Sequence, residues 1–175
     1  MKNEILKIQL PDAKEILRRG LKWAIGEKAI WRPEYDKVAD WLSDNKHKGL
    51  LCFGSDGLGK TLICDDIMEN IFRYYLRKNY IKLTAFQMKD HIEDINDSCS
   101  VFIDDVGIEP TVVNYGERYE PFVEIIYNAE RNGQLLVLTT NLNPKQLTER
   151  YGERTFNRLS AIVRPIVFTG GNLRK

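Results

Sequence analysis

The chain has 175 residues, of which 43% are hydrophobic, so it can bury one core of ordinary size and would be crowded as two domains. Its formal net charge of +1 gives no electrostatic argument for or against a nucleic-acid partner. The 3 cysteines and 2 histidines lack the spacing of a zinc site, and neither a signal peptide nor a membrane-length apolar run is present, so we expect a soluble, cytoplasmic protein without a membrane partner.

Residues 1–30 are predicted to form a helical extension ahead of the main domain. Ile16, Leu17, Leu21 and Ile25 recur at helical spacing and form an apolar stripe. A stripe of this length is equally compatible with a helix that docks a partner protein and with a helix that packs on its own domain.

A glycine-rich loop between a predicted strand and a predicted helix is the most specific pattern in the chain. A short helix beginning at Pro33 is expected to precede the strand Gly49–Phe53, and apolar residues at helical spacing follow the loop to about Lys78. The loop reads G-x-x-x-x-G-K-T and consists of Gly54, Ser55, Asp56, Gly57, Leu58, Gly59, Lys60 and Thr61. This pattern in this context indicates a phosphate-binding loop.

The residue types of the loop suit a nucleoside triphosphate. Glycines let the backbone turn its N–H groups toward an anion at the positive end of a helix. Lys60 is expected to reach the β- and γ-phosphates, Thr61 is expected to ligate Mg²⁺, and Leu62 continues the nucleotide-binding segment into the helix.

Strand and helix patterns alternate after the loop helix. Residues Tyr80–Thr84 alternate like a strand, and Phe86–Ile95 has helical spacing, which favours a parallel sheet. At the end of the loop helix, just before this strand, Arg73–Tyr80 interleaves cations with tyrosines. Such a cluster would suit a stacking platform for single-stranded DNA, but tyrosines at helical spacing are more often core residues, and charged helix ends are usually solvated.

Two carboxylates follow the next apolar strand. The run Val101–Ile103 ends at Asp104 and Asp105. The carboxyl ends of parallel strands meet the ligand crevice, so we expect Asp104 to hold Mg²⁺ and Asp105 to polarise an attacking water as a general base. A solvated Asp-Asp turn is the alternative.

A third strand, Gln134–Leu138, runs into a polar triplet that ends at Asn141. The Asn141 amide has the groups needed to orient a water against a γ-phosphate and to sense that phosphate. A turn or a helix cap ahead of Pro144 is equally compatible with the triplet. A final strand is predicted at Ile166–Phe168.

Several motifs in order resemble the DnaC/IstB-type AAA+ ATPases. Besides the glycine-rich loop, these are Ile103–Gly107, Ile125–Asn128, Leu138–Leu142, Tyr151–Leu159 and Val167–Arg174. The resemblance covers nearly all of the chain from Trp31 onward. It implies a P-loop α/β fold with a five-stranded parallel sheet flanked by helices, without an all-helical lid, in an AAA+ domain spanning residues 31–175.

The family also implies a site shared between subunits. Its members complete the ATP site with an arginine from a neighbouring subunit in a head-to-tail homo-oligomer, and Arg158 matches that finger best. Arg154 lies one helical turn earlier and shares the match, Arg174 matches a second sensor arginine that acts in cis, and Trp31 and Tyr35 lie where the family holds adenine. A surface or packing role is the alternative for each of these residues.

The resemblance implies an ATP- and Mg²⁺-dependent helicase loader or replication accessory ATPase, with slow hydrolysis stimulated by assembly or DNA. Its expected partners are a replicative helicase, single-stranded DNA and further copies of itself. The alternatives are an IstB-like transposition helper, an adaptor that binds ATP without hydrolysing it, and a P-loop small-molecule kinase. The kinase is disfavoured because the span from Asp105 to Tyr119 has no recognisable lid pattern.

Overall fold

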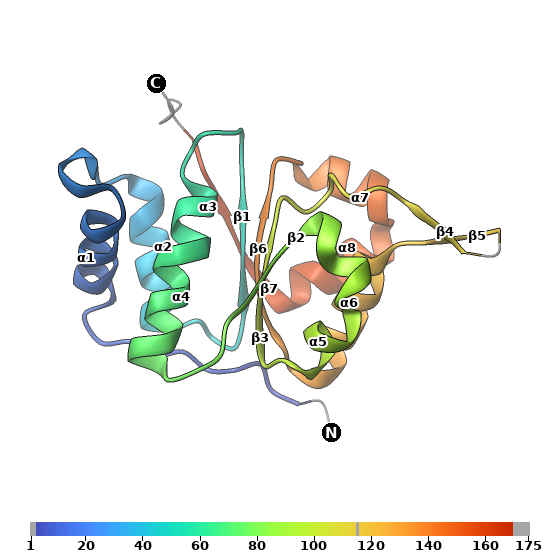
Figure 1. Cartoon of the computed structure of the whole chain (residues 1–175), viewed down its shortest axis with the longest axis horizontal. Helices are drawn as coiled ribbons and strands as arrows, with labels where there is room; N and C mark the ends of the chain where they lie inside the picture. Colours follow the sequence, from blue (N-terminus) through green and yellow to red (C-terminus); the bar gives the residue numbers. More distant parts are fainter. Residues whose placement is uncertain (1–2, 115, 170–175) are drawn as a thin grey trace.

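A five-stranded parallel sheet forms the centre of the computed structural model, which describes residues 3–114 and 116–169 (Figure 1). Its strands are β1 (Gly49–Phe53), β2 (Ile81–Thr84), β3 (Ser100–Asp104), β6 (Leu135–Thr140) and β7 (Val163–Val167). They lie in the order β2-β3-β6-β1-β7, and every neighbouring pair is parallel. The predicted α/β class and the five parallel strands are confirmed.

Side chains of the central strands alternate between two buried faces. Leu50 and Cys52 of β1 enter one apolar cluster, whereas Leu51 enters the other. Val137 and Leu138 of β6 divide in the same way. Because successive strand residues point to opposite faces, a sheet covered on both sides needs nearly continuous apolar strands, as this sequence has.

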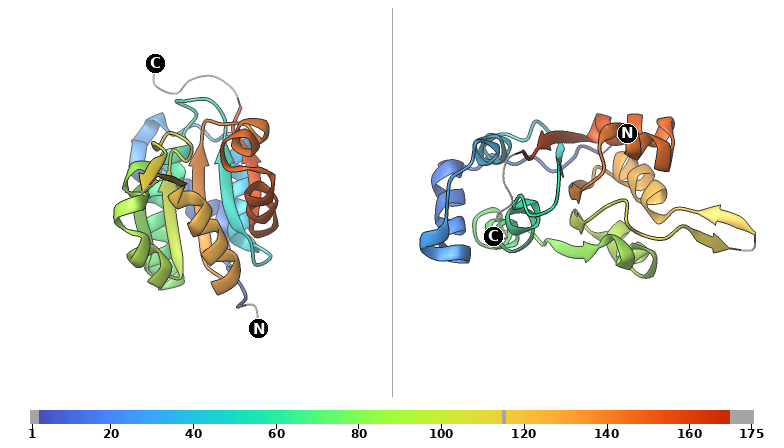
Figure 2. Two further views of the ribbon diagram at one scale, coloured as in Figure 1. Left: turned by 90° about the vertical axis from the view of Figure 1, so that its right-hand side faces the viewer. Right: turned by 90° about the horizontal axis from the view of Figure 1, so that it is seen from above.

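Helices cover both faces (Figures 1 and 2). On one face lie α1 (Ala13–Ile25), α2 (Pro33–Ser43) and the loop helix, which is built of α3 (Lys60–Leu62), a π-helical stretch (Ile63–Ile67), α4 (Met68–Asn70) and a second π-helical stretch (Ile71–Leu76). On the other face lie α5 (Ile92–Asp97), α6 (Pro121–Asn132), α7 (Pro144–Tyr151) and α8 (Glu153–Ile162).

The described part of the N-terminal extension packs on the domain that follows it. Leu17 and Leu21 of α1 are buried in the same cluster as α2, and Ile8 also lies in that cluster. Asn45 holds the segment before α1, because its side chain accepts a hydrogen bond from the Ile8 N–H and donates one to the Leu6 carbonyl. The apolar stripe of α1 is therefore used within the chain. The boundary at residue 30 and a docking role of the extension stay predictions.

A β-hairpin projects from the domain between β3 and α6 (Figures 1 and 2). It consists of β4 (Val112–Asn114) and β5 (Glu117–Tyr119), paired antiparallel. At its base the Thr111 hydroxyl donates to Glu120 at 2.8 Å. The sequence pattern did not predict this element.

Two elements differ from the predicted ones by more than two residues or in helix type. The expected helix Phe86–Ile95 is a 3-10 turn (Ala85–Asp90) followed by α5, because His91 leaves the helical backbone region with φ −129° and ψ 23°. β7 begins at Val163, three residues before the predicted start at Ile166, since Pro165 is tolerated in a strand at the edge of the sheet. Within the described residues, no helix is both long and apolar enough to cross a membrane.

Candidate nucleotide-binding site

The glycine-rich loop joins β1 to the loop helix at the carboxyl edge of the sheet, as predicted from its sequence context. Gly54 adopts φ +146°, and a Cβ there would lie 2.2 Å from the carbonyl oxygen of Phe168, the residue after β7, so this close approach requires glycine. Gly59 caps the helix with φ +85°, a left-handed conformation that glycine adopts without strain. The loop therefore has the backbone shape of an anion cradle ahead of a helix.

Lys60 of the loop motif is a buried residue, with 5% exposure. Nζ donates to the carbonyls of Gly54 and Ser55 at 2.7 and 2.8 Å, and to Asn141 Oδ1 at 2.9 Å. Desolvation lowers the pKa of the amine, while the nearby Asp56 and Asp105 carboxylates act in the opposite sense. The cation is thus aimed along the loop where phosphates would lie.

Thr61 and Asp104 join the loop to the end of β3. The Thr61 hydroxyl donates to Asp104 Oδ1 at 2.9 Å. A hydroxyl and a carboxylate are hard oxygen ligands, and Mg²⁺ beside a triphosphate typically uses such a pair. The two residues therefore fit the predicted metal ligands.

Asp105 follows Asp104 in a left-handed backbone conformation, φ +56°. It lines the cavity beside the glycine-rich loop. The Asp105 N–H donates to the Thr139 hydroxyl at 2.9 Å, and this hydroxyl donates to Asp104 Oδ1. The turn after β3 thus directs the two acids differently, with Asp104 toward Thr61 and Asp105 toward the cavity.

Asn141 lies beside the loop, as expected for a residue at the end of β6. Its Oδ1 accepts from Lys60, and its Nδ2 donates to Asp56 Oδ1 at 2.7 Å. One side chain therefore connects the lysine and an acid of the same loop across the carboxyl edge of the sheet. This position is compatible with a phosphate sensor.

A cavity of about 310 Å³ opens beside the loop. Its lining includes Leu58, Lys60, Thr61, Leu62 and Asp105 from the predicted site. The far wall comes from the N-terminal part of the chain and consists of Ile25, Lys28, Ile30 and Tyr35. Apart from Lys28, this wall is aliphatic or aromatic, which suits a nucleoside base beside a phosphate cradle.

Trp31 does not line this cavity, in contrast to its predicted contact with adenine. Its ring lies under the cations of Lys14 and Arg18, and its indole N–H donates to Asp36 at 3.1 Å. It lines a separate cavity formed by α1 and by residues 26–31, which follow that helix. The neighbouring Ile30 lines the nucleotide-loop cavity, and so does Tyr35 in the first turn of α2, the other residue expected near adenine.

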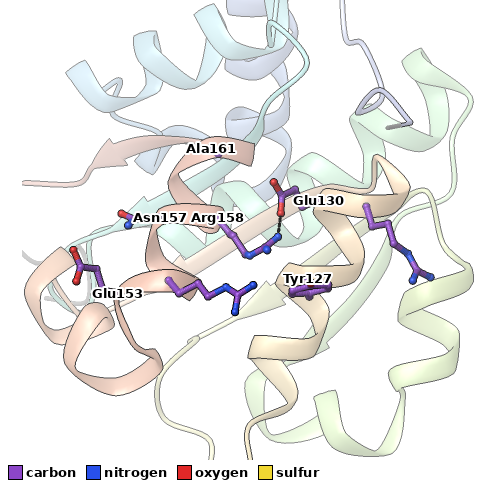
Figure 3. A pocket seen from close by; sticks show the side chains of 8 residues that line it. Tyr127, Glu130, Glu153, Asn157, Arg158 and Ala161 are labelled. Carbon is purple, nitrogen blue, oxygen red and sulfur yellow. Dashed lines mark hydrogen bonds and ion pairs between the residues drawn. The ribbon is translucent and has the colours of Figure 1, made fainter. Parts of the chain in front are cut away.

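The two predicted finger arginines lie apart from the loop, on α8. Arg154 and Arg158 line a cavity of about 820 Å³ together with Tyr127 and Glu130 of α6 (Figure 3). The Arg158 guanidinium pairs with Glu130 and lies 4.3 Å from the Tyr127 ring centroid. The two cavities share no lining residue within the described residues, so this chain does not bring Arg158 to its own loop. Arg174 lies outside the described residues.

Sequence reasoning missed three groups of residues at these sites. Thr139 was noted only as part of a polar strand end, and nothing in the sequence pairs Glu130 with Arg158. Ile25, Lys28 and Ile30 belong to a segment that was assigned to the extension. The spacing of strand ends was the available signal for Thr139, because parallel strands place their carboxyl ends at one edge.

No protein-family model matches this chain, and no curated protein matches it by sequence. Solved structures match in fold. The crystal structure of the DnaC helicase loader is 17% identical over 79% of this chain and 92% of that chain, with a TM-score of 0.62. A putative primosome component from Streptococcus pyogenes serotype M3 is 15% identical over 95% and 93%, with a TM-score of 0.66. AMPPCP-bound DnaA from Aquifex aeolicus is 14% identical over 83% of this chain and 50% of that chain, with a TM-score of 0.57.

These likenesses cover most of the chain with TM-scores above 0.5, and they show the fold. No all-helical domain follows β7 in the part of the chain described, which ends at residue 169. The chain therefore shares the fold of the DnaC helicase loader and of the primosome component, with no lid domain within its described residues.

Proposed function

We propose that this protein is an ATP-binding and ATP-hydrolysing helicase loader of the DnaC type. The observation that carries the proposal is the Thr61–Asp104 hydrogen bond, which joins the phosphate-binding loop to the acid-bearing strand end. The fold shared with the DnaC helicase loader and with AMPPCP-bound DnaA supports both parts of the proposal.

Each polar group of the site has a role in this reaction. The loop backbone and Lys60 would bind the triphosphate, and Asn141 would orient the γ-phosphate. Thr61 and Asp104 would hold Mg²⁺, which when bound neutralises charge on the phosphate oxygens. Asp105 would accept a proton from the attacking water. Ile25, Ile30 and Tyr35 would contact the base.

Completion of the site requires a second copy of the chain. Arg158 and Arg154 lie in a cavity that does not include the loop, so a head-to-tail neighbour is the source of an arginine for transferring phosphoryl oxygens. A finger of this kind contributes about 10³- to 10⁵-fold in rate. Turnover per subunit should therefore rise with protein concentration.

The test of the enzyme is Mg²⁺-dependent release of phosphate from ATP, with Asp105→Asn and Lys60→Ala beside the natural chain. We expect Asp105→Asn to bind ATP and to lose at least about 100-fold in turnover, since a general base contributes about 10²- to 10⁴-fold. Lys60→Ala should lose binding as well. Equal turnover of the natural chain and Asp105→Asn would leave a protein that binds ATP without hydrolysing it.

The loader role is tested with a replicative helicase and single-stranded DNA. We expect a complex with the helicase that forms with ATP and is retained by Asp105→Asn. Lys60→Ala is the matched control. It leaves the surface of α1 unchanged but should not bind ATP, so it should not form the complex. A natural chain that hydrolyses ATP but neither binds the helicase nor promotes its transfer to DNA would remove the loader role and leave the ATPase.

Direct contact with single-stranded DNA is proposed for the end of the loop helix. Tyr74 and Tyr75 are 56% and 47% exposed, and the Arg73 guanidinium lies 5.6 Å from the Tyr74 ring centroid. Exposed aromatic rings beside cations suit base stacking, whereas Tyr80 is used in the core. Tyr74→Ser should weaken binding of oligothymidylate about tenfold. Tyr127→Ser, at a similarly exposed ring on α6, is the control and should not.

A further inference from the structure

The Thr139 hydroxyl lies between the two acids that follow β3. It donates to Asp104 Oδ1 at 2.5 Å and accepts the backbone N–H of Asp105 at 2.9 Å. Thr139 is fully buried in β6, between β3 and β1. One hydroxyl therefore both donates and accepts a hydrogen bond, and its two partners are the consecutive residues Asp104 and Asp105 at the end of β3.

The register of the sheet explains why these groups meet. Ile103 of β3 pairs with Leu138 of β6, so Asp104 and Thr139 are the next residues of two parallel strands. Thr139 also accepts the Val106 N–H on its carbonyl at 2.8 Å. The backbone that carries the acids is thus fastened to β6 on both sides of Asp105.

The backbone of Asp105 needs these hydrogen bonds to stabilise its conformation. Its φ of +56° lies in the left-handed region, which costs free energy for a residue with a side chain. This conformation separates the directions of the two carboxylates, because Asp104 meets Thr61 while Asp105 lines the nucleotide cavity. The hydroxyl at position 139 therefore fixes the backbone turn at which the carboxylates of Asp104 and Asp105 begin to point in different directions.

We propose that Thr139 is a positioning residue that sets the Asp104 carboxylate for Mg²⁺ and the Asp105 carboxylate for the attacking water. The proposal rests on the ATPase function proposed above and deepens it. Thr139 does not line the cavity, so it acts through the two acids and not on the nucleotide. Its O–H group orients the Asp104 carboxylate, and its oxygen accepts the backbone N–H of Asp105.

Substitution separates the hydroxyl from the shape of the side chain. Thr139→Val keeps the branched shape and loses both hydrogen bonds, whereas Thr139→Ser keeps the hydroxyl. Thr140 supplies a matched control on the same strand. It is equally buried, and its hydroxyl donates to the Val106 carbonyl and accepts the Leu142 N–H, so Thr140→Val also loses two hydrogen bonds but none to an acid.

The experiment measures three quantities for the natural chain and the three variants. These are nucleotide affinity in EDTA, the Mg²⁺ concentration that gives half of the Mg²⁺-dependent gain in nucleotide affinity, and kcat for ATP. Removal of a group that orients a metal ligand typically costs 10- to 100-fold in metal affinity or activity. For Thr139→Val we expect unchanged affinity in EDTA, an about tenfold higher Mg²⁺ requirement and an about 10- to 100-fold lower kcat.

The comparison among variants decides the outcome. Thr139→Ser should stay within about threefold of the natural chain, and Thr140→Val should lower the thermal midpoint like Thr139→Val while keeping the natural Mg²⁺ requirement. Should Thr139→Val fail to fold, Thr139→Ala takes its place against Thr139→Ser. The proposal would be overturned if the variant without the Thr139 hydroxyl kept the Mg²⁺ requirement and kcat of the natural chain. It would also be overturned if Thr140→Val shifted both quantities equally. Absence of ATP turnover in the natural chain would instead remove the proposed ATPase, and the Mg²⁺ requirement of binding would still test Thr139.

Discussion

The guanidinium of Arg158 on α8 pairs with the carboxylate of Glu130 on α6 and lies 4.3 Å from the centroid of the Tyr127 ring (Figure 3). The arginine proposed to act on a neighbouring subunit is therefore held against its own chain. Both side chains of the ion pair are largely buried, with 27% and 16% exposure, so the contact is better protected from solvent than a fully exposed surface pair. An arginine that reaches a second subunit has to leave this contact.

Replacement of Glu130 by glutamine should make the finger easier to release. A pair near the surface contributes about 0.2–1 kcal/mol, so we expect Glu130→Gln to raise turnover per subunit about two- to fivefold at protein concentrations where assembly is limiting. Arg158→Ala should bind ATP normally and lose the part of turnover that depends on concentration. The measurement is phosphate release per subunit over a series of protein concentrations.

Glu153→Gln is the matched control for this prediction. Glu153 lines the same cavity, but the carboxylate that pairs with Arg158 belongs to Glu130. We expect Glu153→Gln to behave like the natural chain. Lower turnover in Glu130→Gln would mean that Glu130 presents the arginine instead of restraining it, and natural turnover in Arg158→Ala would exclude Arg158 as the finger.

The sequence predicted the parts of the site that depend on local patterns. The loop around Lys60, the acids Asp104 and Asp105, and the polar end of β6 at Asn141 could be found because each motif lies within a few residues of a recognisable strand. The side-chain contacts between these motifs depend on strand register. The Thr139 contact with Asp104 was therefore not predictable from spacing alone.

The wall of the cavity depends on tertiary packing. Ile30 and Trp31 are adjacent, yet Ile30 lines the nucleotide cavity while Trp31 packs under Lys14 and Arg18 of α1. A resemblance placed adenine near this segment but could not choose between neighbours whose side chains point in different directions. The Arg158–Glu130 pair, 28 residues apart in the chain, follows from the packing of α8 on α6 in the same way.

Ile30 and Trp31 should respond differently to substitution. Ile30 is 69% exposed at the cavity, so Ile30→Ser should weaken nucleotide binding about three- to tenfold through lost apolar contact, with little effect on folding. Trp31→Ala should lower the free energy of unfolding by about 1–3 kcal/mol and keep nucleotide affinity within about twofold. Titration of a fluorescent ATP analogue and denaturant unfolding separate the two effects. A larger loss of affinity in Trp31→Ala would restore the adenine role of the tryptophan.

Asp56 should oppose triphosphate binding. Its carboxylate lines the cavity within the phosphate-binding loop and accepts a hydrogen bond from Asn141 at 2.7 Å, so it repels a polyanion and competes for the sensor amide. We expect Asp56→Asn to raise ATP affinity about fivefold, which corresponds to ~1 kcal/mol of removed repulsion. Calorimetric titration at two salt concentrations measures this gain, which should shrink at high salt. Asp90→Asn, at an exposed site, is the control, and weaker binding by Asp56→Asn would show that its hydrogen bond to Asn141 matters more than its charge.

Glu34 should make stability depend on pH. The residue is buried at 4% exposure, and its Oε1 accepts the backbone N–H and the hydroxyl of Thr169 at 2.7 and 3.0 Å. Burial by itself raises the pKa of this carboxyl, but the hydrogen bonds from Thr169 and from its own backbone, together with Arg32, hold the pKa below its ordinary value of 4.5. A carboxyl whose pKa is lowered by folding stabilises the native state above its unfolded pKa, and this contribution is lost as pH falls through the folded pKa.

Glu34→Gln keeps the size of the side chain and removes the charge. We expect it to lower the free energy of unfolding by about 1–3 kcal/mol at pH 7, because hydrogen bonds to a charged group are lost. The difference from the natural chain should hold down to about pH 4.5 and then shrink as the natural carboxyl becomes protonated. Urea unfolding between pH 7 and pH 3 measures it, with Glu93→Gln at an exposed position as the control, expected within about 0.5 kcal/mol throughout. A difference in unfolding free energy that stays constant down to pH 3 would mean that Glu34 acts through its shape and neutral hydrogen bonds. Its charge would then not stabilise the contact between α2 and Thr169.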